Sequence, residues 1–266
     1  MIDELFFKAG LGKQKLNYIF FGFLVTIAGF FTSLILFKAD SLATLLVITM
    51  LLMPVLMRLF QKEERIVRDK RLKHILRNHK SVFESYFLLF LGIFFAFLIL
   101  QLVTIHNQDF FAKAFEFQTN WVVDHQEGLG VVDLGVKEVV SYAFLSDLLI
   151  LIVGFLFSFV YGSGGIFLIV AAASILSTYL IYLMRFFESF LGFGYFLLIN
   201  FFLYIIPQVF VFIVASTAGG ILSKGVVSEN ISGKHYENVF FDALRLFVYS
   251  ILLLIFVNIV RSIISY

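Results

Sequence analysis

Three polar side chains lie four residues apart in one long apolar stretch of the chain: Asn200, Tyr204 and Gln208. On a helix they share one face, and Pro207 beside them frees a backbone carbonyl about one turn earlier. Polar groups at membrane depth mark paths for substrates or ions, so these four residues are a candidate cavity of a transporter or channel. The alternative is a structural kink with hydrogen bonds between helices. Two more polar residues occupy other apolar stretches: Gln101 and Asn258.

The sequence offers little for catalysis or metal binding. His106 and His125 match no ligand spacing, and the chain has no cysteine to act as a nucleophile or a zinc ligand. It also lacks the motifs of zinc proteases, serine hydrolases, phosphate-binding loops and dinucleotide-binding folds. We therefore expect no enzymatic activity, no metal and no cofactor.

The composition indicates which elements hold these residues. Of the 266 residues, 61% are hydrophobic and 14% are charged, whereas soluble domains contain about 45–50% apolar residues. Several apolar runs reach the roughly 20 residues that a helix needs to cross a membrane. The sequence therefore predicts an all-α polytopic transmembrane bundle, with residues 1–266 forming a single membrane domain. A net charge of +2 gives no reason to expect nucleic acid as a partner.

Hydropathy predicts about seven membrane crossings. The fourth and fifth are short, so about six crossings, or about five with re-entrant segments, are the alternatives. The expected crossings cover residues 16–37, 42–60, 83–105, 145–161, 166–184, 196–222 and 244–265.

A basic segment at residues 61–82 sets the expected orientation in the cell membrane. The positive-inside rule places this segment, and with it the N-terminus, in the cytoplasm. Its apolar residues recur at helical spacing, which predicts a loop helix whose basic side contacts anionic lipid head groups. The alternative is a segment that only fixes the topology. The candidate head-group contacts are Arg65, Arg68, Lys70, Arg71, Lys73 and Arg77.

The segment at residues 106–142 then lies outside the cytoplasm, and its acidic residues outnumber its basic ones. Its aromatic residues predict an interfacial helix that caps the bundle, because aromatic rings favour the head-group region. These aromatic residues are Phe110, Phe111, Phe115, Phe117 and Trp121. Asp147, at the start of the fourth crossing, is expected near the outer surface.

Small residues gather in three patches in the second half of the chain. Lipid provides no hydrophobic force between helices, so small side chains, which let two backbones approach closely, indicate where helices pack. The glycines of the first patch also permit a tight reversal. We expect these faces to bring copies of the chain together as a homo-oligomer. The residues are Gly162, Gly164 and Gly165, then Ala173 and Ser174, then Ala215, Gly219 and Gly220.

The second half of the chain contains the stretches "LLILIVGFLFSFVYGSGGIFLIVAAAS" and "YIIPQVFVFIVASTAGGILS". These two stretches resemble the stage II sporulation protein M family. The first half is similar to the archaeal branch of that family in "LFFKAGLGKQKLNYIFFGFLVTIAGFFTSLILF" and "HKSVFESYFLLFLGIFFAF". The resemblance covers nearly the whole chain and implies a membrane scaffold or membrane-remodelling component that works with protein partners.

The resemblance carries over a packing role for Gly162, Gly165, Gly219 and Gly220. Elsewhere this chain departs from the family, with Ala172 where relatives have Asn, and Tyr204 and Gln208 where relatives have His and Glu. A proton-coupled role is therefore not implied.

Two functions remain after these arguments. The first is a non-enzymatic membrane scaffold or membrane-shaping protein that self-associates and contacts membrane lipids and an unidentified protein partner. The second is a transporter or channel for small molecules or ions. A transporter should have a wet cavity along the face that carries Tyr204, whereas a scaffold should fill that space with Phe and Leu.

Overall fold

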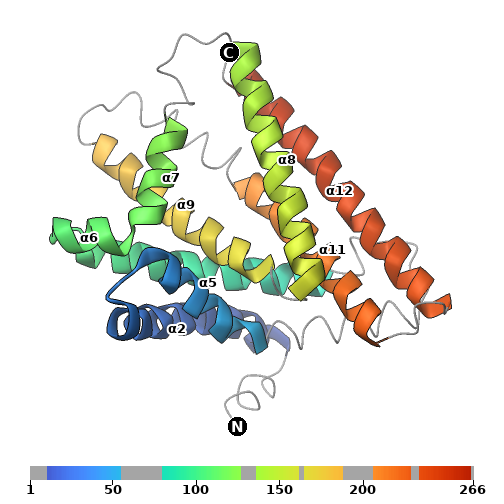
Figure 1. Cartoon of the computed structure of the whole chain (residues 1–266), viewed down its shortest axis with the longest axis horizontal. Helices are drawn as coiled ribbons and strands as arrows, with labels where there is room; N and C mark the ends of the chain where they lie inside the picture. The colour runs from blue at the N-terminus through green and yellow to red at the C-terminus, as the bar shows by residue number, and fades with distance from the viewer. Residues whose placement is uncertain are drawn as a thin grey trace.

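A computed structural model describes residues 11–54, 80–126, 136–161, 165–187, 206–228 and 234–264. Every regular element in these ranges is a helix (Figure 1). Five of these helices contain a stretch long and apolar enough to cross a membrane: Leu16–Phe37, Phe83–Thr104, Gly165–Tyr182, Ile206–Ser223 and Tyr236–Val260. The predicted all-α membrane fold is confirmed at this level.

The predicted number of about seven crossings is not confirmed. Within the described residues, the second and fourth expected crossings correspond to shorter apolar helices, Ser41–Pro54 and Asp147–Val160. The helix Ser41–Pro54 reaches the edge of a described range, and residues 55–60 of the second expected crossing lie outside it. The stretch Asp147–Val160 is shorter than the roughly 20 residues that span the hydrocarbon region. Part of the sixth expected crossing, residues 196–205, lies outside the described residues.

A helical hairpin opens the described chain. Helix α2 (Leu11–Phe37) ends at a tight turn, in which Lys38 and Ala39 have positive φ angles of 54° and 62°. Asp40 then caps the helix Ser41–Pro54, because its Oδ1 accepts a hydrogen bond from the Ala43 N–H at 2.8 Å. The turn thus sends the chain straight back along α2.

The two arms of this hairpin pack through small and polar groups. Ile48 occupies the space where Gly29 has no side chain. Nearer the turn, the hydroxyl oxygens of Ser33 and Thr44 are hydrogen-bonded at 2.7 Å, and both side chains are buried. In an apolar surrounding this bond satisfies two groups that would be costly to bury alone.

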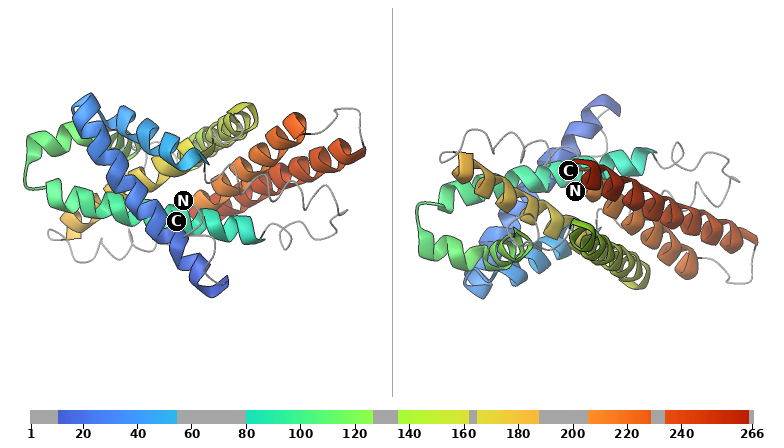
Figure 2. Two further views of the ribbon diagram at one scale, coloured as in Figure 1. Left: turned by 90° about the horizontal axis from the view of Figure 1, so that it is seen from below. Right: turned by 90° about the horizontal axis from the view of Figure 1, so that it is seen from above.

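Helix α5 (Lys80–Thr104) crosses α2 and leads into two short helices, α6 (Gln108–Ala114) and α7 (Glu116–Gln126) (Figure 2). Phe115 stacks on Phe30 of α2 with ring centroids 5.9 Å apart, and Phe111 and Phe115 both belong to the buried core. This differs from the single interfacial helix expected from the sequence: the aromatic residues that suggested head-group contact instead pack partly against the protein itself.

The second half contains α8 (Val136–Tyr161), α9 (Gly165–Phe187), α11 (Ile206–Ser228) and α12 (Lys234–Ile264). Helix α11 contacts α5, α8, α9 and α12, and 72% of its apolar stretch is buried, against 28% for α2 and 33% for α12. The last helix starts earlier than predicted, at Lys234, because buried Asp242 and exposed Arg245 interrupt its hydropathy but not its helical backbone.

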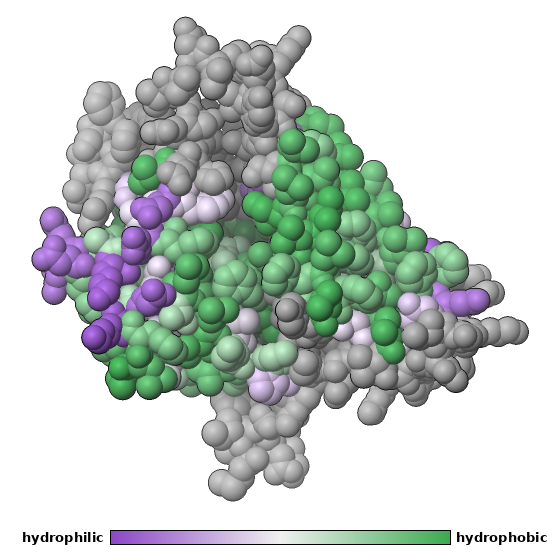
Figure 3. Space-filling model, viewed as in Figure 1, coloured by the Kyte–Doolittle hydropathy of each residue, from purple (hydrophilic) through white to green (hydrophobic). Residues whose placement is uncertain are grey.

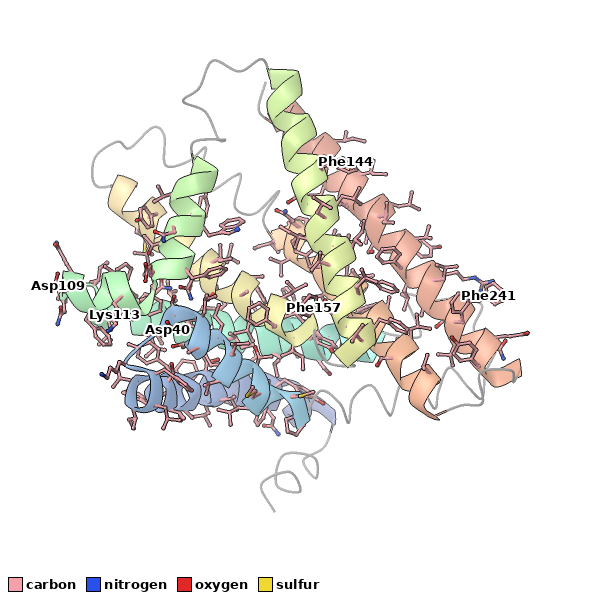
Figure 4. All side chains as sticks on the ribbon, viewed as in Figure 1. Asp40, Asp109, Lys113, Phe144, Phe157 and Phe241 are labelled. Carbon is pink, nitrogen blue, oxygen red and sulfur yellow. The ribbon has the colours of Figure 1, made fainter. Side chains whose placement is uncertain are left out.

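The face of the second half that is formed by α8 and α12 is largely apolar (Figure 3). Phe157 of α8 and Phe241 of α12 are each more than half exposed (Figure 4), and Leu145, Leu252 and Phe256 resemble them. Hydrophilic residues gather instead over α6, where Asp109 and Lys113 lie. A surface of this kind is compatible with lipid as the surrounding solvent.

Candidate functional site

Many of the residues singled out from the sequence lie outside the described part of the chain. They include two glycines of the first small-residue patch, two members of the candidate cavity and the basic segment. The residues concerned are Gly162, Gly164, Asn200, Tyr204, Arg65, Arg68, Lys70, Arg71, Lys73 and Arg77.

Gly219 lies at the crossing of α11 and α8. A Cβ atom built on Gly219 would lie 2.8 Å from the Cβ of Ser158 and 3.0 Å from the backbone nitrogen of Phe159, and it would also press on the carbonyl oxygen of Phe155. The backbones of the two helices therefore touch here with no side chain between them. Only glycine fits this position without a shift of one helix.

Gly165 brings a third helix to the same region. It is the first residue of α9, and a Cβ atom here would lie 2.7 Å from Ser216 Oγ and 3.2 Å from Ser158 Oγ. The Ser158 hydroxyl donates to the carbonyl oxygen of Ser216 at 2.6 Å. Two of the three predicted small-residue patches thus meet where α8, α9 and α11 converge.

The other described members of these patches are also buried inside one chain. Ala173, Ser174 and Ala215 are at most 1% exposed, and Gly220 is buried as well. These faces are covered by helices of the same molecule, so they offer little surface to a second copy. Self-association stays a prediction, and it would have to use another part of the surface.

Gln208 and Pro207 lie in the first turn of α11, and both are half-buried. The Gln208 side-chain amide donates to Asp147 Oδ1 of α8 at 2.5 Å. Asp147, expected near the outer surface, is only 8% exposed. A buried carboxylate needs hydrogen-bond donors. That Gln208 is one of them could not be predicted, because the two residues are 61 positions apart in the chain.

Apolar side chains follow Gln208 on α11. Val211, one turn beyond Gln208, is buried in a small core against which Phe144 and Leu148 of α8 pack. On another face of α11, Phe210 packs against Phe83 of α5 with ring centroids 6.1 Å apart. The start of α11 therefore has the close apolar packing expected of a scaffold.

A second polar cluster lies where α5, α7 and α9 meet. The Gln101 amide nitrogen of α5 donates to Ser177 Oγ at 3.1 Å and to Thr178 Oγ1 at 2.8 Å on α9. From α7, the Gln118 amide nitrogen donates to Ser174 Oγ at 3.4 Å. All five side chains are at most 1% exposed. From the sequence, Gln101 is an isolated polar residue in an apolar stretch, and its contacts with α9 and its proximity to Gln118 appear only in the fold.

Asn258 of α12 is the remaining buried amide singled out from the sequence. It is 5% exposed, and its amide nitrogen donates to the carbonyl oxygen of Leu254 in its own helix at 3.0 Å. Within the described ranges, no three His, Cys, Asp or Glu side chains come together as metal ligands would. The buried polar groups of these ranges are thus mainly amides and hydroxyls.

Comparisons with known proteins identify no relative. No family model, no curated protein and no solved structure matches the chain.

Proposed function

We propose that the chain is a non-enzymatic integral membrane protein that serves as a scaffold or shapes the membrane. The observation that carries this proposal is the enclosure of α11, whose backbone touches that of α8 at Gly219. Direct backbone contact leaves no space to open between these helices, which favours a rigid bundle over a moving one. The resemblance to the stage II sporulation protein M family points to the same class of role.

Reconstituted vesicles test this function. The full chain is incorporated into liposomes of neutral and anionic lipids, and vesicle shape and size are measured by electron cryomicroscopy against protein-free vesicles. We expect curved or clustered vesicles with the natural chain, and loss of the effect in Gly219→Leu. A matched change on the lipid-facing side, Leu252→Phe, should keep the effect. Vesicles that look the same with and without the protein would contradict the membrane-shaping role.

The proposed topology places the N-terminus and residues 61–82 in the cytoplasm. This topology requires the turn at Lys38 and the α6–α7 segment to lie on the same side of the membrane. A hydrogen bond between the two segments supports this, because Ser41 Oγ accepts from the Phe117 N–H at 3.2 Å. Because the chain has no cysteine, single cysteines at Lys38 and Lys70 can be labelled in intact cells with an impermeant reagent. Labelling at Lys38 alone is expected, and labelling at Lys70 alone would reverse the topology.

Transport of a small molecule or ion is the second candidate, and the Asp147–Gln208 pair favours it. A buried carboxylate that is hydrogen-bonded to a half-buried amide among apolar helices is the kind of group that coupling ions and substrates use. Flux of ions and small solutes into proteoliposomes tests this function. Flux that disappears in Gln208→Leu but persists in Leu149→Phe, on the exposed side of α8, would support it. Flux that survives Gln208→Leu would remove Gln208 from the pathway.

A further inference from the structure

The buried side-chain amides of Gln101 and Gln118 are each hydrogen-bonded to hydroxyl groups of α9. The surroundings of these hydroxyl groups show whether the nitrogen or the oxygen of each amide faces α9. Ser177 Oγ lies 2.7 Å, and Thr178 Oγ1 3.0 Å, from the carbonyl oxygen of Ser174. A carbonyl oxygen can only accept, so both hydroxyls point their protons at it. They have only lone pairs left for Gln101, which must therefore present its NH₂ group to them.

The same reasoning fixes the second amide. Ser174 Oγ lies 2.8 Å from the carbonyl oxygen of Ala171 and donates its proton there. It can then only accept from Gln118, which turns its NH₂ group toward α9. Both amide oxygens consequently face away from the hydroxyls, and rotating either amide would place two acceptors against each other.

Neither amide oxygen receives a hydrogen bond within the described part of the chain. Gln101 Oε1 and Gln118 Oε1 are both buried, and none of the described residues donates to them. A buried carbonyl oxygen without a donor is unfavourable and rare in folded proteins. Two such oxygens in one helix junction therefore indicate that something else supplies the positive end of an interaction.

The two amides lie next to each other on α9. Gln118 donates to Ser174 and Gln101 donates to Thr178, and these two residues of α9 are one helical turn apart on the same face of the helix. A single small ligand between neighbouring amide oxygens can contact both at ordinary hydrogen-bond or ion-coordination distances. The surrounding groups are neutral amides and hydroxyls, so they suit water or a monovalent cation better than a divalent one, which prefers carboxylates.

We propose that Gln101 and Gln118 jointly bind one small ligand that presents protons or positive charge to their amide oxygens. The ligand is either a water molecule or a dehydrated monovalent cation such as Na⁺ or K⁺. In both cases the amide of α5 and the amide of α7 are coupled through it, although no hydrogen bond joins the two glutamines directly. This site is separate from the Asp147–Gln208 pair and does not depend on either proposed function.

A double-mutant cycle on thermal unfolding in detergent tests the coupling. With a shared ligand, Gln101→Leu and Gln118→Leu each lower Tm, and the double variant is little worse than either single one, since the first change already releases the ligand. Without a ligand, each leucine removes one unsatisfied oxygen together with the hydrogen bonds that its amide nitrogen makes to α9, and the two effects on Tm add. That second result would overturn the proposal. Methionine at the two positions repeats the cycle if a leucine variant fails to fold.

Salt exchange on the natural chain distinguishes the two ligands. Unfolding is measured in KCl, NaCl and N-methyl-D-glucamine chloride at equal ionic strength. A cation is identified if one alkali ion raises Tm saturably by about 5 °C. This rise should be absent in the double variant with Gln101→Leu and Gln118→Leu, and it should be retained in Gln208→Leu. Coupling in the cycle without an ion effect identifies water. Additive effects with no ion response would exclude a shared ligand of either kind.

Discussion

Gly22 of α2 and Gly92 of α5 lie against each other where these helices cross. A Cβ atom on Gly22 would lie 3.5 Å from the Cα of Gly92 and 2.7 Å from the carbonyl oxygen of Leu89. A Cβ atom on Gly92 would press on the carbonyl oxygen of Ile19 and lie 3.0 Å from the backbone nitrogen of Phe23. The first half of the chain is thus joined by the same kind of backbone contact as the second.

Replacement of Gly92 by leucine should separate α2 from α5. We expect the free energy of unfolding to fall by about 1–3 kcal/mol or more, because the side chain meets backbone that cannot move away locally. Thermal unfolding in detergent measures this. Ala28→Leu, on the exposed side of α2, is the control and should leave Tm nearly unchanged. Equal Tm values for the natural chain and Gly92→Leu would show that the two helices do not meet there.

The sequence predicted the extent of several helices well. The expected crossings at 16–37, 83–105 and 166–184 lie within two residues of the apolar stretches Leu16–Phe37, Phe83–Thr104 and Gly165–Tyr182. The reason is physical: an uninterrupted run of apolar residues has to be long enough for the hydrocarbon region, and length can be read from one sequence.

The pairing of helices could not be read in the same way. Gly92 and Ala96 have the same small-xxx-small spacing as Ala215 and Gly219, and Thr26 follows Gly22 at that interval, so these positions carried a packing signal that the sequence predictions did not use. The contact of Gly22 with Gly92 depends on the crossing of two helices, which the spacing within either helix does not specify. The Asp147–Gln208 hydrogen bond is hidden for the same reason. The functional roles of the predicted site residues remain predictions. The structure gives the positions of those site residues that lie in the described part of the chain.

Gly219 and Gly154 should respond differently to the same small change. An alanine at 219 would place its methyl group against the backbone of α8, whereas an alanine at 154 would meet the flexible end of Leu168. We expect Gly219→Ala to cost about 1–3 kcal/mol of unfolding free energy and Gly154→Ala clearly less. Thermal unfolding of the two variants side by side measures the difference. A larger loss in Gly154→Ala would argue against close contact of α8 and α11.

Removal of the Ser158 hydroxyl should weaken the same crossing by a smaller amount. Ser158→Ala loses the hydrogen bond to the Ser216 carbonyl but keeps the small side chain that Gly219 requires, so we expect a loss of about 0.5–1.5 kcal/mol. Chemical or thermal unfolding quantifies it. Thr32→Ala is the control, since the Thr32 hydroxyl is exposed and bonds only within its own helix. A loss no greater than in the control would mean that the bond adds nothing to helix association.

The turn after α2 offers a prediction in which one substitution stabilises and another destabilises. Lys38 is exposed and has a φ angle of 54°, a conformation that costs a residue with a Cβ atom about 1–2 kcal/mol. Lys38→Gly removes this cost, and after the entropy that glycine loses on folding we expect a gain of up to about 1 kcal/mol. Lys38→Val should be destabilising, because a branched side chain fits this backbone worst.

Lys113 provides the matched control for this turn. It is also an exposed lysine, but it lies in the last turn of α6 and has no positive φ angle. Glycine in a helix is unfavourable by about 1 kcal/mol relative to good helix formers, so Lys113→Gly should lower Tm where Lys38→Gly raises it. Thermal unfolding of these three variants and of Lys113→Val gives the comparison. The same order of glycine and valine at both positions would show that the backbone at Lys38 does not adopt the left-handed conformation.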